Sequence, residues 1–145
     1  MNVQVVTGFG STNAFALGLT AGVGNLIVGY DEPGSDGSSS DKTGVHNLIV
    51  GPGHSYTGSL GGFVAGTENS ISGLYSSVSG GQFNTASRFL ASVSGGQANT
   101  ASGSYSSVSG GFNNTASGDW SSILGGNGAT TSADYDCFPA CSLLR

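Results

Sequence analysis

Charged side chains are scarce in this sequence, and basic ones are the scarcest. Of 145 residues, three are lysine or arginine and eight are aspartate or glutamate, which gives a formal net charge of −5. A chain with so few cations cannot neutralise a run of phosphates, so we expect no binding to nucleic acid. The same shortage argues against an anionic membrane surface as a partner.

Long apolar runs are also missing. The N-terminal stretch MNVQVVTGFGSTNAF has no basic segment and no continuous apolar run of the length that a signal peptide or a membrane span needs. We nevertheless expect an extracellular or cell-surface protein, of which this chain is a piece that carries neither the export signal nor the anchor.

The patterns that carry catalysis are absent too. Serine is abundant but never stands in GxSxG, there are no paired carboxylates, and no helix pattern follows the SGG glycine pairs, which excludes a phosphate loop. His46 and His54 have no third ligand, so they make a poor metal site. We predict no enzyme activity, no catalytic residue, no cofactor and no metal.

Two smaller groups of reactive side chains have ordinary interpretations. Carboxylates gather among serine, glycine and proline at Asp31, Glu32, Asp36 and Asp41, without the alternation of a calcium loop, so a solvated surface loop is predicted. Cys137 and Cys141 flank a proline near the C-terminus. They form either a small disulfide loop or two free thiols.

Glycine, in contrast, is plentiful, with 27 residues, and much of it belongs to a repeat. A fifteen-residue unit is written about six times between His46 and Tyr135, most clearly as SSVSGGQFNTASRFL, ASVSGGQANTASGSY and SSVSGGFNNTASGDW from Ser76 to Trp120. A short fixed period indicates stacked coils, because one unit is too small to bury its own apolar face. We predict an all-β, single-domain parallel β-solenoid or β-roll with coils of about 15 residues and two short strands per coil.

Aligning the copies turns positions into columns. Apolar residues that alternate with small or polar ones predict two strands with one buried face: the third column holds Leu48, Phe63, Val78, Val93, Val108 and Ile123, and the eleventh holds Tyr56, Ile71, Ala86, Ala101, Ala116 and Thr131. The sixth column is always glycine, which predicts a positive φ or a close backbone approach. The ninth is His54, four asparagines and Ala129. Asparagine there suits a left-handed turn, backbone hydrogen bonds, or a ladder between coils.

The repeat also sets the predicted boundaries. Residues 1–23 are expected to form an N-terminal capping coil, 24–135 the solenoid, and 136–145 an irregular tail. GNLIVG (24–29) nearly duplicates HNLIVG (46–51), so it should be a coil of its own, lengthened by a loop insertion at 31–45.

Large apolar residues recur at the fifteenth position, in Leu60, Tyr75, Leu90, Tyr105, Trp120 and Tyr135. Two arrangements are open: the side chains pack inward at a corner, or they form an outward seam for another chain, with Tyr75, Leu90, Tyr105 and Trp120 as the candidate seam. Valine facing alanine gives a thin core, and 27 glycines lose much backbone freedom on folding, so we expect self-association.

The run SSVSGGxxNTASG resembles the head repeats of trimeric autotransporter adhesins of the YadA-like family. The matching residues are the serine–apolar–serine–glycine step at Ser77 to Gly80, the alanine–serine step at Ala86 and Ser87, and their later copies. The resemblance implies a homotrimer of β-rolls on a cell surface that binds extracellular matrix or host cells. The function predicted is a non-catalytic structural or adhesive surface module.

Hydroxyl side chains around the buried positions form two candidate binding grids. The Thr–Ser grid consists of Thr85, Ser87, Thr100, Ser102, Thr115 and Ser117, and the Ser–Ser grid of Ser77, Ser79, Ser92, Ser94, Ser107 and Ser109. Their regular spacing resembles the threonine faces of insect antifreeze β-helices and implies ice binding as an alternative function. A phage tail-fibre segment is the remaining alternative. The simplest interpretation is that these side chains solvate thin sheets.

Overall fold

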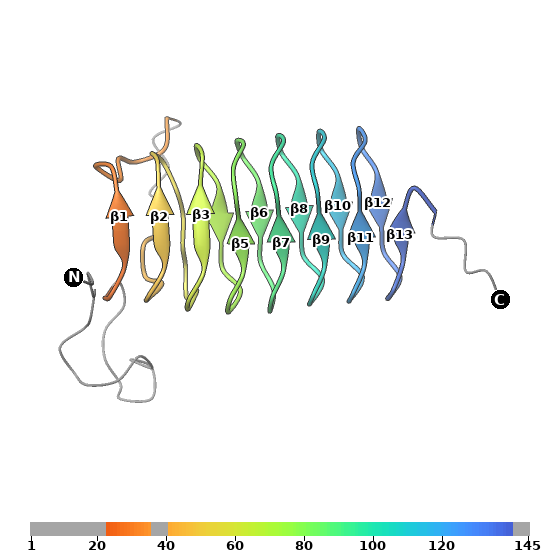
Figure 1. Ribbon diagram of the computed structural model, residues 1–145, viewed down its shortest axis with the longest axis horizontal. Coiled ribbons are helices and arrows are strands. Elements are labelled where there is room, and N and C mark those ends of the chain that lie inside the picture. Colours follow the sequence, from red (N-terminus) through yellow and green to blue (C-terminus); the bar gives the residue numbers. More distant parts are fainter. Residues whose placement is uncertain (1–22, 36–40, 141–145) are drawn as a thin grey trace, which may run out of the picture.

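The computed structural model describes residues 23–35 and 41–140, and this part of the chain is all-β. The chain winds through stacked coils whose strands pair in parallel with those of the coils before and after (Figure 1). The predicted β-solenoid with coils of about 15 residues and two short strands per coil is confirmed. The predicted capping coil at 1–23 lies outside the described residues except for Val23.

Two parallel sheets form the walls of the solenoid. The larger has the order β1 (Leu26–Val28), β2 (Leu48–Val50), β3 (Phe63–Ala65), β5 (Ser77–Val78), β7 (Ser92–Val93), β9 (Ser107–Val108), β11 (Ser122–Ile123) and β13 (Cys137–Phe138). The smaller has the order β4 (Ser70–Ile71), β6 (Thr85–Ala86), β8 (Thr100–Ala101), β10 (Thr115–Ala116) and β12 (Thr130–Thr131). Single parallel bridges between coils, such as Gln82 with Gln97, form a third ladder at one corner.

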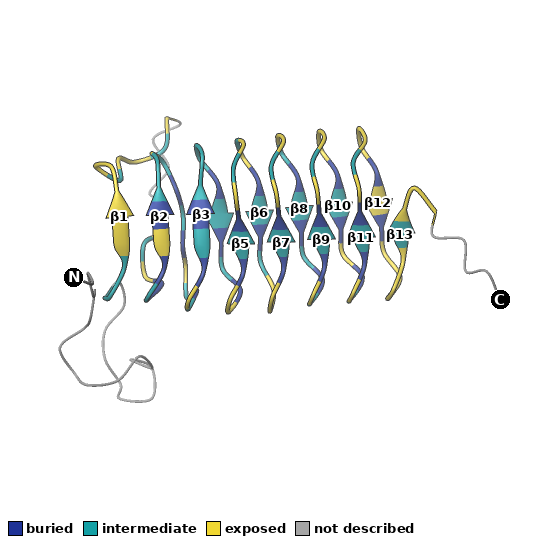
Figure 2. Cartoon of the chain, in the orientation of Figure 1, coloured by how far each residue is buried: buried dark blue, intermediate teal, exposed yellow. Residues whose placement is uncertain are grey.

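The core is a thin double row between the sheets. Each strand from β2 to β12 buries one residue, and Figure 2 shows buried residues in these strands between exposed turns, whereas β1 is exposed. The inward residues of the larger sheet are Ile49, Val64, Val78, Val93, Val108 and Ile123, and those of the smaller are Tyr56, Ile71, Ala86, Ala101, Ala116 and Thr131. Valine facing alanine therefore fills the centre of the solenoid, as predicted.

The prediction that Leu48 and Phe63 are buried core residues is wrong, for the same reason at both positions. Leu48 is exposed and Phe63 is half-buried, while the next residues, Ile49 and Val64, are fully buried. Val64 pairs with Val78, only fourteen positions on, so the early coils have one residue fewer between the buried strand residue and the glycine corner. A fixed fifteen-residue alignment kept the glycines in register but shifted these two strands by one residue, which exchanges the two faces.

The glycine corner meets both predicted requirements. Gly96 has φ of +84°, and a Cβ built on it would lie 2.3 Å from the carbonyl oxygen of Gly111 on the next coil. Gly81 is alike, with φ of +79° and a Cβ 2.0 Å from the Gly96 oxygen. Any side chain here would therefore collide with the backbone of the following coil.

The first coil and its insertion pack more closely than a solvated loop would. GNLIVG does form a strand, since β1 pairs with β2 in register. The Asp31 carboxylate accepts a hydrogen bond from the Tyr56 hydroxyl (2.8 Å) and pairs with Lys42 (3.0 Å), and the backbone N–H of Tyr56 donates to the Asp41 carbonyl (2.8 Å). The described part of the insertion is thus a surface loop with Glu32 and Asp41 exposed, but its Asp31 carboxylate is held by Tyr56 and Lys42 and is not freely solvated. Asp36 lies outside the described residues.

The C-terminal end also departs from the predicted irregular tail. Cys137–Phe138 form β13 and pair with β11, so that Phe138 follows Ile123 in the inward column of the larger sheet. A Cβ on Gly126 would lie 3.2 Å from the Phe138 ring. The ring thus lies at the end of the core, 43% exposed because no further described coil covers it.

Candidate functional site

The asparagine column is an interior hydrogen-bond ladder. Asn69, Asn84, Asn99 and Asn114 are at most 1% exposed, and each side-chain oxygen accepts a hydrogen bond from the backbone N–H one coil further on, at 2.8–3.0 Å. Each side-chain amide donates to two backbone carbonyls; Asn99, for example, donates to Gly95 and Gly111, both at 3.0 Å. The predicted ladder is confirmed, but the left-handed residue is the preceding one, such as Ala98 with φ of 56°.

His54 starts this ladder and is a structural residue. It is fully buried, its Nδ1 accepts a hydrogen bond from the Asn69 backbone N–H (3.2 Å), and its Nε2 lies 3.0 Å from the Val50 carbonyl oxygen. This geometry requires the neutral tautomer that carries its proton on Nε2. His46 lies at the opposite corner with φ of 54°. In the described part of the chain no group of three or more potential metal ligands occurs.

The Thr–Ser grid lies on the smaller sheet in regular register. Thr85, Thr100 and Thr115 pair in sequence across β6, β8 and β10, and none is buried. Neighbouring strands lie about 4.8 Å apart, so the hydroxyls repeat at that interval. Ser70 and Thr130 extend the same row. In the sequence, Ser70 and Thr130 stand at the tenth position of two weaker repeat copies, the position that Thr85, Thr100 and Thr115 have in the clear copies. This shared position could have identified them.

The Ser–Ser grid lies on the larger sheet. Ser77, Ser92 and Ser107 pair in register across β5, β7 and β9, and Ser79, Ser94 and Ser109 follow beyond the buried valines. The first three are half-buried and the second three exposed. Of all the hydroxyls in the two predicted grids, only that of Ser117 donates a hydrogen bond within the described residues, to the Thr131 carbonyl (3.1 Å). Two faces of the solenoid thus present rows of hydroxyls to solvent.

The large residues of the fifteenth column point outward. Tyr75, Leu90, Tyr105, Trp120 and Tyr135 all have φ between 55° and 62° and are 43–72% exposed. The alternative of inward corner packing is therefore wrong. Leu60 is not part of this column, because Gly61, with φ of 63°, takes the corner position.

The exposed rings form one continuous row along the solenoid, here called the aromatic row: Tyr75, Phe89, Tyr105, Trp120 and Tyr135. Ring centres lie 5.0–6.0 Å apart, edge-on around Phe89 and stacked from Tyr105 to Tyr135, where interplanar angles are 5° and 3°. Phe89 was not predicted. It supplies the ring in the coil whose corner residue is Leu90. The sequence signal for this was that a phenylalanine stands directly beside Leu90, the aliphatic residue in an otherwise aromatic stretch of the column.

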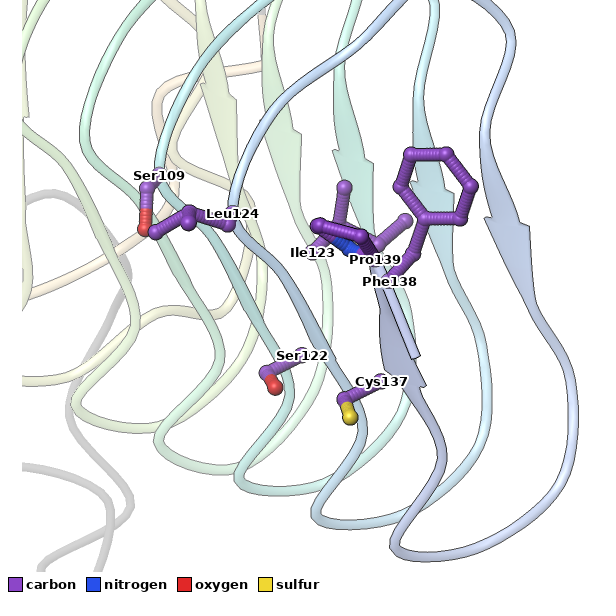
Figure 3. A pocket seen from close by; sticks show the side chains of 7 residues that line it. All are labelled: Ser109, Ser122, Ile123, Leu124, Cys137, Phe138 and Pro139. Atoms are coloured by element: carbon purple, nitrogen blue, oxygen red, sulfur yellow. The ribbon is translucent and has the colours of Figure 1, made fainter. Parts of the chain in front are cut away.

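One shallow hollow lies at the C-terminal end of the larger sheet (Figure 3). Its volume is about 340 Å³, and it is lined by Ser109, Ser122, Ile123, Leu124, Cys137, Phe138 and Pro139. None of these side chains is charged. The hollow is the open end of the sheet and offers no acid, base or metal ligand.

Cys137 is disulfide-bonded, which resolves the choice between disulfide and thiol for this residue. Cys141, the other cysteine of the sequence, lies outside the described residues. A disulfide is typical of oxidising compartments. Across 23–35 and 41–140 there is no helix of the length and apolarity that crossing a membrane requires.

The geometry alone must carry the functional argument. No family model, curated protein or solved structure matches the chain. The resemblance of the repeat unit to adhesin head repeats therefore stays a prediction.

Proposed function

We propose that the chain is a non-catalytic structural module of an exported, adhesin-like surface protein, and that it acts as a homo-oligomer assembled along the aromatic row. The β-solenoid supports this role, because a stack of identical coils gives a stiff rod with long repetitive faces. The disulfide at Cys137 fits an exported protein.

The aromatic row is the observation that carries the proposal. Five rings and Leu90 stand on one edge, each at least 38% exposed. Monomeric proteins rarely expose a contiguous apolar surface of this kind, and large ones mark interaction sites. The thin valine–alanine core adds a reason for association, since one buried valine contributes only about 1.5–3 kcal/mol.

Light scattering of the purified protein tests the proposal. The native chain should have the mass of an oligomer, and Tyr105→Ser with Trp120→Ser should lower it to that of a monomer. Tyr30→Ser is the matched control, since Tyr30 is 93% exposed and lies outside the row. Far-ultraviolet circular dichroism checks that the variants keep their β-structure. A native monomer at all concentrations would contradict the proposal.

Adhesion needs its own measurement. The native oligomer should be retained on surfaces coated with extracellular-matrix protein, and retention should fall when the Ser–Ser grid is interrupted by Ser94→Lys. The matched control is Leu124→Lys, because Leu124 directly follows β11 as Ser94 directly follows β7, but it is not a hydroxyl residue. Equal retention of a denatured sample would show that the surface binds the chain unspecifically.

Ice binding is a second candidate, favoured by one observation. Thr85, Thr100 and Thr115 stand in register, and their hydroxyls make no hydrogen bond within the described residues. Inhibition of ice recrystallisation that disappears with Thr100→Leu would support this function. If the native protein does not inhibit ice recrystallisation, ice binding is ruled out as its function.

A further inference from the structure

Charge is distributed unevenly along the aromatic row. Arg88 lies in the turn between β6 and β7, just before Phe89, and is exposed. Asp119 lies in the equivalent turn between β10 and β11, just before Trp120, and Asp134 lies one coil further on. The row therefore has a cation near one end and carboxylates near the other.

Arg88 also lacks a partner of opposite charge. The ion pair of the described residues joins Lys42 to Asp31, far from the row, and Arg88 makes none there. Asp119 accepts a hydrogen bond from the Ser104 backbone N–H through Oδ1 (2.7 Å), which holds the carboxylate in place at this edge. Its other oxygen makes no hydrogen bond within the described part of the chain. Both charges are thus available to a partner.

The coils that carry the two charges are symmetric about the coil of Tyr105, although Arg88 lies one position earlier in its coil than Asp119 does. Arg88 belongs to the coil before Tyr105 and Asp119 to the coil after it, each roughly 5 Å away along the stack. A two-fold axis through Tyr105 would therefore place Arg88 of one copy opposite Asp119 of the other, twice per pair. It would also place Tyr75 opposite Tyr135, so that the whole row is covered.

A parallel arrangement has the opposite electrostatic effect. Copies packed in parallel would bring Asp119 beside Asp119 and Asp134 beside Asp134, with Arg88 beside Arg88. Like charges next to each other across an interface are unfavourable and suppress that geometry. The charges therefore favour an antiparallel pair over the parallel trimer that the resemblance implies.

The exposed area is close to what a stable pair requires. An aromatic side chain buries about 150–250 Å² when covered. The five rings, Leu90 and the neighbouring Leu74 are 38–72% exposed, which leaves roughly 100 Å² on each and roughly 700 Å² in all. Specific interfaces cover about 800 Å² per partner.

We propose that a second copy of this chain covers the aromatic row in an antiparallel, two-fold arrangement centred on Tyr105, with Arg88 of each copy paired to Asp119 of the other. The inference rests on the proposed self-association and adds the partner's orientation. An isologous pair of this kind is closed, so it leaves both hydroxyl faces free.

Charge reversal tests the pairing. The native protein should have a mass near twice that of the 14.2-kDa chain. Arg88→Asp and Asp119→Arg should each raise the dissociation constant at least about ten-fold, and the double variant should restore most of the affinity. Glu32→Lys, away from the row, is the control. A double variant as weak as the singles would overturn the pairing.

Cysteine cross-linking tests the orientation separately. In the antiparallel pair, neither Arg88→Cys nor Asp119→Cys should cross-link with itself under mild oxidation. An equal mixture of the two variants should give a covalent dimer that a reducing agent cleaves. If each variant cross-links with itself and the mixture adds nothing, the chains are parallel: the orientation is overturned, while self-association stands. A native chain that is monomeric in light scattering overturns both.

Discussion

The side-chain oxygen of Asn84 accepts a hydrogen bond from the backbone N–H of Asn99, one coil further along the chain, at 2.9 Å. Asn99 repeats the contact to Asn114 at 3.0 Å, and Asn114 to Ala129 at 2.8 Å. These contacts satisfy buried backbone donors at a corner where the strands have ended. An unpaired buried donor would cost about 1–3 kcal/mol, so the ladder is required for coils to stack.

Replacing Asn99 by alanine should therefore lower the free energy of unfolding by about 2–4 kcal/mol, since it unpairs the Asn114 N–H and the Gly95 carbonyl. The Gly111 carbonyl loses one of its two donors and keeps the Gln97 N–H. Urea denaturation measures the loss. Asn127→Ala is the control, because the exposed Asn127 side chain makes no hydrogen bond in the described residues, and it should change stability by less than about 0.5 kcal/mol. Equal effects of the two substitutions would contradict the role of the ladder.

Two adjacent glycines should respond oppositely to alanine. Gly96→Ala places a Cβ 2.3 Å from the Gly111 oxygen at φ of +84° and should destabilise the protein by about 3 kcal/mol or more. Gly95 has no atom within 4 Å of the position of an added Cβ, so Gly95→Ala should be neutral or stabilise by about 0.4–1 kcal/mol. Thermal unfolding of both variants decides, and a loss of stability in Gly95→Ala comparable to that in Gly96→Ala would refute the steric explanation.

Ala98 should be improved by glycine. Its φ of 56° costs a residue with a Cβ about 1–2 kcal/mol, whereas glycine loses about 0.5–1 kcal/mol through its freer unfolded chain. Ala98→Gly should thus stabilise the protein by up to about 1.5 kcal/mol. At the corresponding corner two coils later the chain already has a glycine, Gly128, with φ of +72°. Ala101→Gly in the buried strand β8 should instead destabilise the protein. Urea denaturation of the two variants should therefore show changes in the free energy of unfolding of opposite sign.

Alkaline pH should weaken the first coil through Tyr56. Burial, then the hydrogen bond to Asp31 and its negative charge, raise the pKa of the Tyr56 phenol above its ordinary value of 10.0. As pH rises above that value, the unfolded chain loses this proton before the folded chain does, so the free energy of unfolding falls, by at most about 1.4 kcal/mol per pH unit. The contribution is fully present below pH 10.

Urea titrations between pH 8 and 11 measure this dependence. Tyr56→Phe should flatten it, because no proton remains to be lost, and the control Tyr30→Phe should leave it unchanged. A slope that persists in Tyr56→Phe would show that another group causes it.

Much of the architecture followed from the sequence because the repeat makes each position a column. Gly81, Gly96 and Gly111 stand at identical intervals and indicated the corner, and Val78, Val93 and Val108 indicated the buried strand, both as found. The prediction was wrong where the period itself changes. In the coils of Leu48 and Phe63, the segment between the buried strand residue and the glycine corner is one residue shorter than in later coils. No feature of a single unit reveals whether the strand or the glycine keeps its place in the alignment.

The sequence by itself determined that this protein is a stack of coils, because units of about fifteen residues with one apolar residue per strand cannot fold singly and can only bury that residue against their neighbours. Only the tertiary structure decided where the corner residues point. The backbone at Tyr75, Tyr105 and Trp120 has positive φ, and each N–H donates a hydrogen bond to a carbonyl of the preceding coil, such as Tyr105 N–H to Phe89 at 2.8 Å. This backbone geometry directs the side chains outward. That direction depends on contacts between coils, which are not encoded in any one unit.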